Sequence, residues 1–250
     1  NSDFDFVEYG PNAYPSLLYN AMVNPLVGLS MQGVIWYQGE NNTNRAKEYY
    51  HLFPAMINDW RKKWGKDFPF YWVQLANYMD VVEVPSESLW AQVREAQTQT
   101  LSLSHTGQAV IIDIGEAKDI HPKNKQEVGR RLALHALHND YGFSDVVCES
   151  PMPKTVRRVQ DKIVVQFDNV ADGLIVKNKY GYLMSFAVAG NDGVYKWVQA
   201  KVAGKDRVVL SCPDVIDPVS VRYAWGDNPD DANLYNSVGL PATPFEIKIE

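Results

Sequence analysis

The first half of the chain alternates between short apolar runs and longer segments with helical spacing. Three runs lack polar alternation, as is typical of strands buried on both faces of a parallel sheet. They cover residues 33–38, 70–75 and 109–112. Three segments with an apolar residue every three or four positions follow them, at about 49–64, 89–101 and 128–137. We expect Pro54 to kink or divide the first of these helices, and Ser86 to cap the second.

Strand and helix alternate three times up to about residue 142, which predicts a parallel sheet with helices on both faces. From about residue 152 the pattern becomes a series of short β-rich runs separated by turns. These runs are 162–167, 182–188, 196–202, 207–210 and 219–223. Asp172-Gly173 and Asp192-Gly193 are typical hairpin turns. We therefore predict an α/β domain over residues 1–150, and a small antiparallel β module with a C-terminal tail over 151–250.

The N-terminal residues 1–32 are predicted to be mostly irregular, because prolines interrupt them at Pro11, Pro15 and Pro25. The first ten residues, NSDFDFVEYG, are polar and acidic and do not resemble a signal peptide. No run of about 18 apolar residues is present to span a membrane.

The composition and charge of the chain indicate a globular protein and exclude some classes of partner. With 250 residues, 46% of them hydrophobic, the chain has enough material for a large buried core. A net charge of −6 without a basic cluster argues against nucleic acid or an anionic membrane surface as a partner.

The cysteines and histidines indicate no metal site. Cys148 and Cys212 form neither a redox pair nor a zinc motif, and we expect buried free thiols, with a disulfide as the alternative. The five histidines show no HExxH spacing. His135 and His138 share a predicted helix face, and we favour packing or surface roles for them over metal binding.

Two segments carry candidate chemistry, and each follows a predicted parallel strand at the end where open α/β sheets bind ligands. The first contains Gly39, Asn41 and Asn42. A glycine N–H beside a side-chain amide can supply the hydrogen-bond donors of an oxyanion hole for acyl transfer. The alternative is a Gly-Asn turn with an asparagine capping the next helix, which spacing alone favours.

The second segment, 111–122, combines three carboxylates with one histidine. His121 is a candidate general base, and Asp119 can accept a hydrogen bond from its second ring nitrogen if the loop turns back. The alternative is a solvated acidic loop. Asp113 and Glu116 are the alternative candidates for the carboxylate partner of His121.

Longer sequence blocks around both segments favour the catalytic interpretation over the structural alternatives. GVIWYQGENN resembles the GVIWYQGE block of the sialate O-acetylesterases, a branch of the SGNH hydrolases, and DIHPKNKQEVGRRLALHAL resembles their histidine block. The stretches FYWVQLANY, LWAQVREAQ and VRYAWGDNPDDANLYNSVGLPATPF are also similar to this family. The matches are collinear and cover most of residues 11–245.

The resemblance implies a flavodoxin-like three-layer α/β/α SGNH-hydrolase domain, here incomplete, with a C-terminal antiparallel β module. It implies a serine esterase that removes acetyl groups from sialic acids or related sugars, without metal or organic cofactor, in a secreted or periplasmic setting. His121 matches the catalytic histidine and Asp119 its carboxylate partner, although many SGNH enzymes place two residues between them rather than one. Gly39 and either Asn41 or Asn42 match the oxyanion block. The neighbouring side chains expected to contact the substrate are Gln38 and Glu40.

The family nucleophile, a serine in a GQSN-type block after the first strand, has no counterpart here. Ser30 precedes the 33–38 strand and so lies at the wrong edge of the sheet, and Ser144 follows a helix. We therefore expect the serine on a missing N-terminal segment or a second chain. Without that segment, the 33–38 strand is expected to lack its ladder partner, and the chain to be inactive and to need association across that edge.

A second hypothesis is a non-catalytic carbohydrate-binding or scaffold protein derived from the same fold. Its sugar-binding candidates are the aromatics of the β module: Tyr180, Tyr182, Tyr195, Trp197 and Trp225. The catalytic reading predicts that Gly39 and His121 lie at one edge of the sheet, across neighbouring strands.

Overall fold

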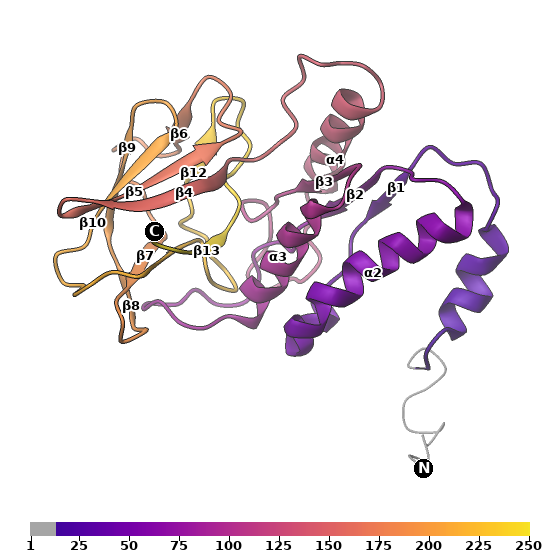
Figure 1. Cartoon of the computed structure of the whole chain (residues 1–250), viewed down its shortest axis with the longest axis horizontal. Helices are drawn as coiled ribbons and strands as arrows, with labels where there is room; N and C mark the ends of the chain where they lie inside the picture. The colour runs from indigo at the N-terminus through magenta and orange to yellow at the C-terminus, as the bar shows by residue number, and fades with distance from the viewer. Residues whose placement is uncertain (1–13) are drawn as a thin grey trace, which may run out of the picture.

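The computed structural model describes residues 14–250, so Pro11 and the acidic N-terminal residues lie outside the described part (Figure 1). Its first half is built on a three-stranded parallel sheet of β1 (Val34–Trp36), β2 (Phe70–Val73) and β3 (Thr106–Ala109), in the order β1-β2-β3. Both strand pairs are parallel, as the apolar runs predict.

Helices cover both faces of this sheet. On one face, α2 (Ala46–Trp64) and α3 (Leu89–Gln99) share a core with β1 and β2 that includes Phe53 and Trp72. On the other face, α4 (Lys125–Asn139) packs Val128 and Leu132 against Tyr71 of β2. Two short 3-10 helices, η4 (Glu40–Arg45) and η5 (Thr100–Ser102), precede α2 and follow α3.

The structure contradicts a division of the first helix at Pro54 and the predicted N-cap of the second helix. Pro54 lies within α2, and the helix runs from Ala46 to Trp64 without being divided there. The N-cap of α3 is Ser88 rather than Ser86, because Ser88 has an extended backbone and its hydroxyl accepts a hydrogen bond from the Ala91 N–H (2.8 Å).

β1 is an edge strand, and it is not buried on both faces as predicted. Val34 and Trp36 belong to the core beneath α2, whereas Ile35 points to the opposite face and is 71% exposed. The cause is that α4 packs over β2 and β3, and no helix among residues 14–250 covers β1 on that side.

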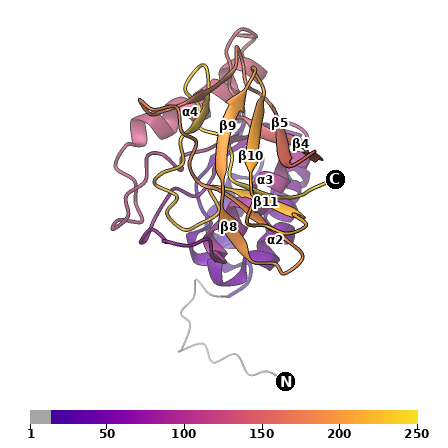
Figure 2. The ribbon, with the colours of Figure 1, turned by 90° about the vertical axis from the view of Figure 1, so that its left-hand side faces the viewer.

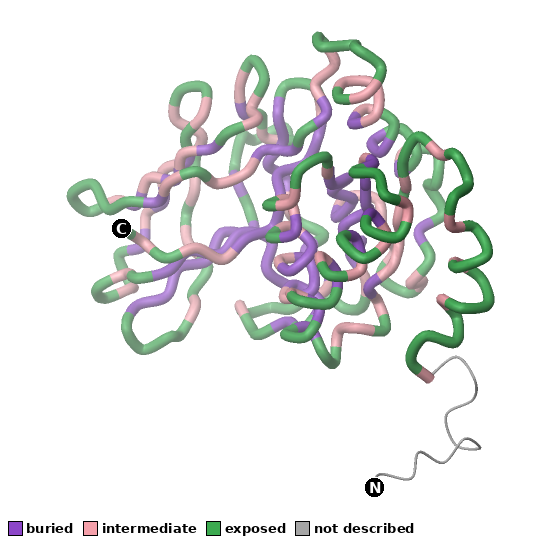
Figure 3. Tube along the Cα trace, turned by 45° about the vertical axis from the view of Figure 1, so that its right-hand side comes forward, coloured by how far each residue is buried: buried purple, intermediate pink, exposed green. Residues whose placement is uncertain are grey.

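Part of the segment predicted to be irregular is helical. A π-helix, η2 (Tyr19–Val23), continues into a 3-10 helix, η3 (Asn24–Leu26), in which Pro25 sits at the start, where its missing N–H breaks no helical bond. Neither helix contains a buried residue, and the segment lies exposed at one end of the molecule, next to the grey trace in Figure 3. Two of its large apolar side chains, Met22 and Leu26, are exposed.

The C-terminal half is built from antiparallel strands, as predicted. Their bounds are β4 Met152–Val159, β5 Lys162–Asp168, β6 Leu174–Val176, β7 Phe186–Ala189, β8 Tyr195–Trp197, β9 Gln199–Ala203, β10 Arg207–Ser211, β11 Ser220–Tyr223, β12 Leu234–Asn236 and β13 Phe245–Lys248. Two four-stranded sheets, β4-β5-β10-β9 and β13-β11-β7-β8, enclose a core, and β12 pairs with β6. Figure 2 shows β8, β9 and β10 on the side away from the parallel sheet.

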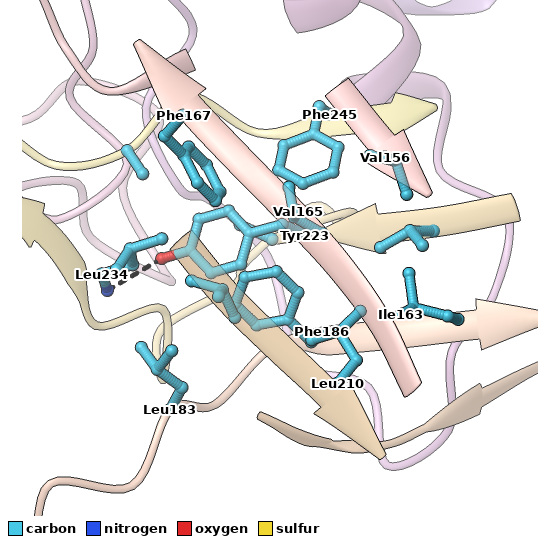
Figure 4. Close-up of a cluster of buried hydrophobic side chains, with 14 of the residues drawn as sticks. Val156, Ile163, Val165, Phe167, Leu183, Phe186, Leu210, Tyr223, Leu234 and Phe245 are labelled. Carbon is cyan, nitrogen blue, oxygen red and sulfur yellow. Dashed lines mark hydrogen bonds between the residues drawn. The ribbon is translucent and has the colours of Figure 1, made fainter. Parts of the chain in front are cut away.

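The core of this β module is aromatic and aliphatic. Val165 from one sheet and Phe186, Tyr223 and Phe245 from the other are all buried and lie together in Figure 4. The Tyr223 hydroxyl accepts a hydrogen bond from the Leu234 N–H (3.0 Å), which satisfies the one polar atom of that ring.

One of the two predicted hairpins is present. β7 and β8 pair across the Asp192-Gly193 turn, where Gly193 has φ +71°, a left-handed conformation that favours glycine. The Asp172-Gly173 turn joins β5 to β6, but these strands do not pair, because β6 pairs with β12.

The predicted strand over 109–112 is shifted. The ladder with β2 covers Thr106–Ala109, and the next three residues are buried without pairing. Ile111 joins the core beneath α4, whereas Val110 and Ile112 join the core of the β module. The two halves of the chain are therefore packed together at the point where the His121 loop begins.

Candidate active site

The loop after β3 carries the histidine and three carboxylates. His121 is highly exposed, with 86% of its side chain accessible. Its ring Nδ1 lies 3.7 Å from Asp119 Oδ1, and the same oxygen accepts a hydrogen bond from the backbone N–H of His121 at 2.9 Å. Asp119 therefore turns back on His121 across the single intervening residue, as the sequence predicted it must in order to act as partner.

The two substitute carboxylates have other partners. Asp113 forms a bidentate ion pair with buried Arg131 (2.6 and 2.8 Å) and accepts a hydrogen bond from the Tyr235 hydroxyl (3.3 Å). Glu116 pairs with Lys123 at 2.9 Å. Asp119 is thus the loop carboxylate directed at His121.

The loop after β1 presents a backbone donor at Gly39. This residue is buried, with φ +147° and ψ −17°, a conformation that side-chain-bearing residues rarely adopt. A Cβ there would meet the Gln97 amide at 3.2 Å and Leu75 at 3.3 Å. Among residues 14–250, the Gly39 N–H donates to no hydrogen-bond acceptor.

Gln38 fixes the orientation of Asn42. The Gln38 Nε2 donates to Asn42 Oδ1 (2.6 Å), which leaves the Asn42 amide nitrogen as a donor. At the other end of the Gln38 amide, Oε1 accepts from the Tyr49 hydroxyl (3.1 Å). Burial raises the pKa of Tyr49 to about 12, so this hydroxyl stays protonated. Asn41 is exposed, and Glu40 is partly exposed beside Gly39.

The two loops leave the same edge of the sheet, because β1 and β3 run parallel to β2. The prediction that they follow neighbouring strands is wrong. β2 lies between β1 and β3 and pairs with both, so the two loops are separated by two strand spacings, about 10 Å. A contact nevertheless joins their surroundings. Lys125, four residues after His121, places its Nζ 5.1 Å from the centroid of the Tyr37 ring, two residues before Gly39.

Asn77, which follows β2 between the two loops, was not singled out from the sequence. Its Oδ1 accepts from the Gly115 N–H (2.7 Å) and its Nδ2 donates to Asn228 Oδ1 (2.9 Å). A Cβ on Gly115 would lie 2.2 Å from the Asn77 carbonyl oxygen, so the His121 loop needs glycine at this crossing. The position of Asn77 directly after a predicted strand was the available signal.

Arg94 of α3 was also missed. It is fully buried, and its guanidinium donates to the carbonyls of Leu75 (2.8 Å), Ala76 (2.7 Å), Gly226 (2.6 Å) and Asp227 (2.9 Å). Burial lowers the pKa of Arg94, but four carbonyl acceptors suit the charged form that arginine keeps in proteins. This residue ties the end of β2 to the 226–228 loop of the β module.

No serine hydroxyl is hydrogen-bonded to His121 among residues 14–250. Ser30 is exposed and precedes β1, at the edge of the sheet opposite to His121. Ser144 follows α4, a helix of 15 residues, about 22 Å long, that begins next to the His121 loop. The described serines therefore supply no partner for the histidine.

His135, His138 and the two cysteines have packing roles. His135 is buried and stacked on Tyr71, with Nε2 3.0 Å from the Gln108 carbonyl, and His138 Nδ1 lies 2.8 Å from the Val146 carbonyl. Cys148 and Cys212 are free and buried, as expected. Within the described range, no helix is both long and apolar enough to cross a bilayer.

Comparison with known proteins identifies the family of this chain. The sequence model described as carbohydrate esterase, sialic acid-specific acetylesterase matches residues 7–138, more than half of the chain. The chain belongs to this family. The match includes both the Gly39 loop and the His121 loop.

Relatives and a solved structure agree with this assignment. The chain is 31% identical to the sialate O-acetylesterase of Homo sapiens over 264 residues and 31% identical to that of Rattus norvegicus over 278 residues. These matches cover 94% and 98% of this chain. The crystal structure of a carbohydrate acetylesterase from Xanthomonas citri superposes with a TM-score of 0.88 at 45% identity, over 94% of this chain.

The chain spans about half the length of the family members that it matches. The coverage is 49% of the human enzyme, 50% of the rat enzyme and 55% of the Xanthomonas citri chain. The resemblance is therefore to the part of these proteins that contains the Gly39 and His121 loops.

Proposed function

We propose that these 250 residues are part of a carbohydrate O-acetylesterase acting on O-acetylated sialic acids or related sugars, and that they supply its catalytic histidine and its oxyanion-hole donors. The observation that carries the proposal is that two loops leave the same edge of the parallel sheet, one with His121 and Asp119, the other with Gly39 and Asn42. The family membership of the chain supports this function.

In this proposal His121 is the general base. Its Nδ1–H is held by Asp119, and its Nε2 removes the proton from a serine hydroxyl as the serine oxygen attacks the acetyl carbonyl carbon. The 3.7 Å between Nδ1 and Asp119 shortens to a hydrogen bond of about 2.8 Å with a shift of about 1 Å. His121 then returns the proton to the departing sugar oxygen, and water attacks the acetyl-enzyme to release acetate.

The negative charge on the carbonyl oxygen is stabilised by the Gly39 N–H and the Asn42 amide, both of which are free to donate. Asn41 is the alternative amide donor. Gln38 orients Asn42 and Glu40 flanks the same turn, so both belong to the proposed substrate-binding surface.

The serine is proposed to come from a segment outside these 250 residues, paired with the free edge of β1. The strand edge carries unpaired backbone groups, and Ile35 beside it is 71% exposed. Apolar side chains in the segment 17–29, which precedes β1 in the chain, are also exposed. A strand and helix on this side would cover both the edge and the open face of β1.

Hydrolysis of p-nitrophenyl acetate tests the proposal. The 250-residue chain alone should release nitrophenol at the rate of background hydrolysis, because its base and oxyanion donors have no nucleophile to assist. Turnover by the chain alone that is abolished in His121→Asn would contradict the absence of the serine. The protein carrying the additional segment should be active, and His121→Asn should abolish that activity.

A further inference from the structure

A cavity of about 460 Å³ lies between the β module and the loop that follows β2. Trp197 of β8 lines it on the side of the β module, and Val82 and Glu83 line it on the side of the loop. Trp225, Asp230 and Asp231 also border it. A second cavity of about 570 Å³ adjoins it across Leu183, Met184 and Val198, which line both.

Three aromatic rings of this region have accessible faces. Trp197 is 43% exposed, and its indole N–H donates to the Glu83 carbonyl (2.9 Å), which holds the ring in place. Tyr180 and Tyr182 are more than two-thirds exposed and stack at 6.3 Å, with Tyr182 lining the second cavity. A fixed, accessible ring is a surface on which the C–H face of a sugar ring packs. One face of Tyr195 is covered by the Arg222 guanidinium, 3.8 Å from the ring centroid.

Two carboxylates border the first cavity and can accept hydrogen bonds. Asp231 accepts from the Ser185 hydroxyl, and Asp230 is exposed without a partner in the described part of the chain. Of the described residues that line this cavity, none is a lysine, arginine or histidine. Carboxylates suit the hydroxyl groups of a sugar, and the same charges repel an anionic ligand.

The cavity wall contains a pair of strained residues and an unpaired buried donor. Ser185 and Ala224 both line the cavity, both have left-handed backbones (φ +62° and +50°), and they are joined by the Ala224 N–H to Ser185 carbonyl bond (3.0 Å). Strained residues of this kind concentrate at ligand sites. The Trp225 indole N–H is buried and lacks a partner among residues 14–250, whereas buried donors are nearly always paired.

We propose that this cavity is a binding site for uncharged sugar rings of a glycan, with Trp197 as its stacking platform and Asp230 and Asp231 as hydroxyl acceptors. The site adjoins the catalytic edge of the sheet. Asn228, which lines the cavity, donates to the Met79 carbonyl (2.8 Å), and the Met79 N–H donates to Ala117 in the His121 loop (3.0 Å). Binding here needs no serine, so it does not rest on the proposed esterase activity.

Isothermal titration of the protein as isolated with xylohexaose, cellohexaose, mannohexaose and 3′-sialyllactose tests the proposal. At least one neutral hexasaccharide should bind at least ~10-fold more tightly than sialyllactose, a difference of about 1.4 kcal/mol. Trp197→Ala should weaken that binding ~10-fold or more. Tyr141→Ala is the control and should leave the binding unchanged, because Tyr141 is an exposed aromatic that lines neither cavity.

Saturation-transfer NMR on the unmodified protein gives a second readout that does not depend on how well Trp197→Ala folds. Irradiation of the aromatic protons should saturate the C–H protons of the bound neutral sugar. Failure of all three neutral hexasaccharides to bind, tighter binding of sialyllactose, or unchanged affinity in Trp197→Ala would each overturn the proposal.

Discussion

His121 shares its loop with three carboxylates, and the partners of each carboxylate separate their roles. Asp119 is directed at His121, whereas Asp113 is held by Arg131 and Tyr235. The sequence left this choice open, because Arg131 is 18 residues from Asp113 and Tyr235 is 122 residues away. Local spacing carries no information on such long-range partners.

Asp119→Asn should lower kcat by ~10³–10⁴-fold in the serine-containing protein with little change in stability, because the amide no longer stabilises the imidazolium. Asp113→Asn is the matched control. It should leave kcat of the folded protein near wild type but lower the free energy of unfolding by about 3–5 kcal/mol, since it breaks a buried ion pair. Kinetics and urea titrations of both variants give the comparison, and a reversal of the two effects would assign the orienting role to Asp113.

The two asparagines beside Gly39 differ in how firmly they are held. Asn42 is oriented by Gln38 at 2.6 Å, whereas Asn41 is exposed. Asn42→Ala should therefore lower kcat by ~10²–10³-fold, the usual effect of losing an oxyanion donor, and Asn41→Ala should change it less than ~10-fold. Measuring kcat and KM for the two variants separates them, and equal losses would show that neither amide is specific.

At the scale of elements, the apolar pattern was sufficient for the alternation of strands and helices and for the antiparallel second half. It failed where tertiary context decides. The run 109–112 reads as one buried strand, yet its residues are divided between two cores. The run 33–38 reads as fully buried, yet Ile35 is exposed because the pattern does not reveal which neighbours cover a strand.

The first turn of α4 contains a titratable contact that gives a pH prediction. Glu127 accepts hydrogen bonds from Arg130 and Arg131 (2.7–2.8 Å). The hydrogen bond from Arg130 has the largest effect, and together these bonds lower the pKa of Glu127 from 4.5 to about 2. Because the pKa is lower in the folded protein, ionised Glu127 stabilises the fold fully above pH 4.5. That contribution is lost as the pH falls from there through about 2.

Glu127→Gln should therefore lower the free energy of unfolding at pH 7 by about 1 kcal/mol, with the difference from wild type vanishing near pH 2. Glu48→Gln, in an exposed pair with Arg45 at 3.8 Å, is the control and should change stability little at any pH. Urea titrations at several pH values measure both. A deficit in Glu127→Gln that persists unchanged at pH 2 would mean that the effect comes from packing rather than charge.

At the scale of the whole molecule, the two halves of the chain meet behind the proposed site. Arg94 joins the end of β2 to the 226–228 loop, and Asn77 joins Asn228 to the start of the His121 loop. The β module is thus part of the framework that positions the loops, rather than a separate appendage. The sequence predicted the module but not these contacts, which link residues more than 130 positions apart.

The opposite side of the parallel sheet is open. Among residues 14–250, no strand pairs with the outer edge of β1, Ile35 is exposed, and the helical segment 19–26 buries none of its residues. An uncovered strand edge of this kind is a template for pairing with another strand. If the proposed serine-bearing segment pairs there, it would supply the nucleophile and also cover the edge of β1.

The origin of the catalytic serine can be tested by labelling the protein as isolated from its source with a fluorophosphonate, followed by mass spectrometry of its peptides. We expect one labelled serine, located outside these 250 residues on a segment that co-purifies with them, and loss of the label in His121→Ala. A label on a serine within the chain, such as Ser30, or labelling unchanged by His121→Ala, would contradict it.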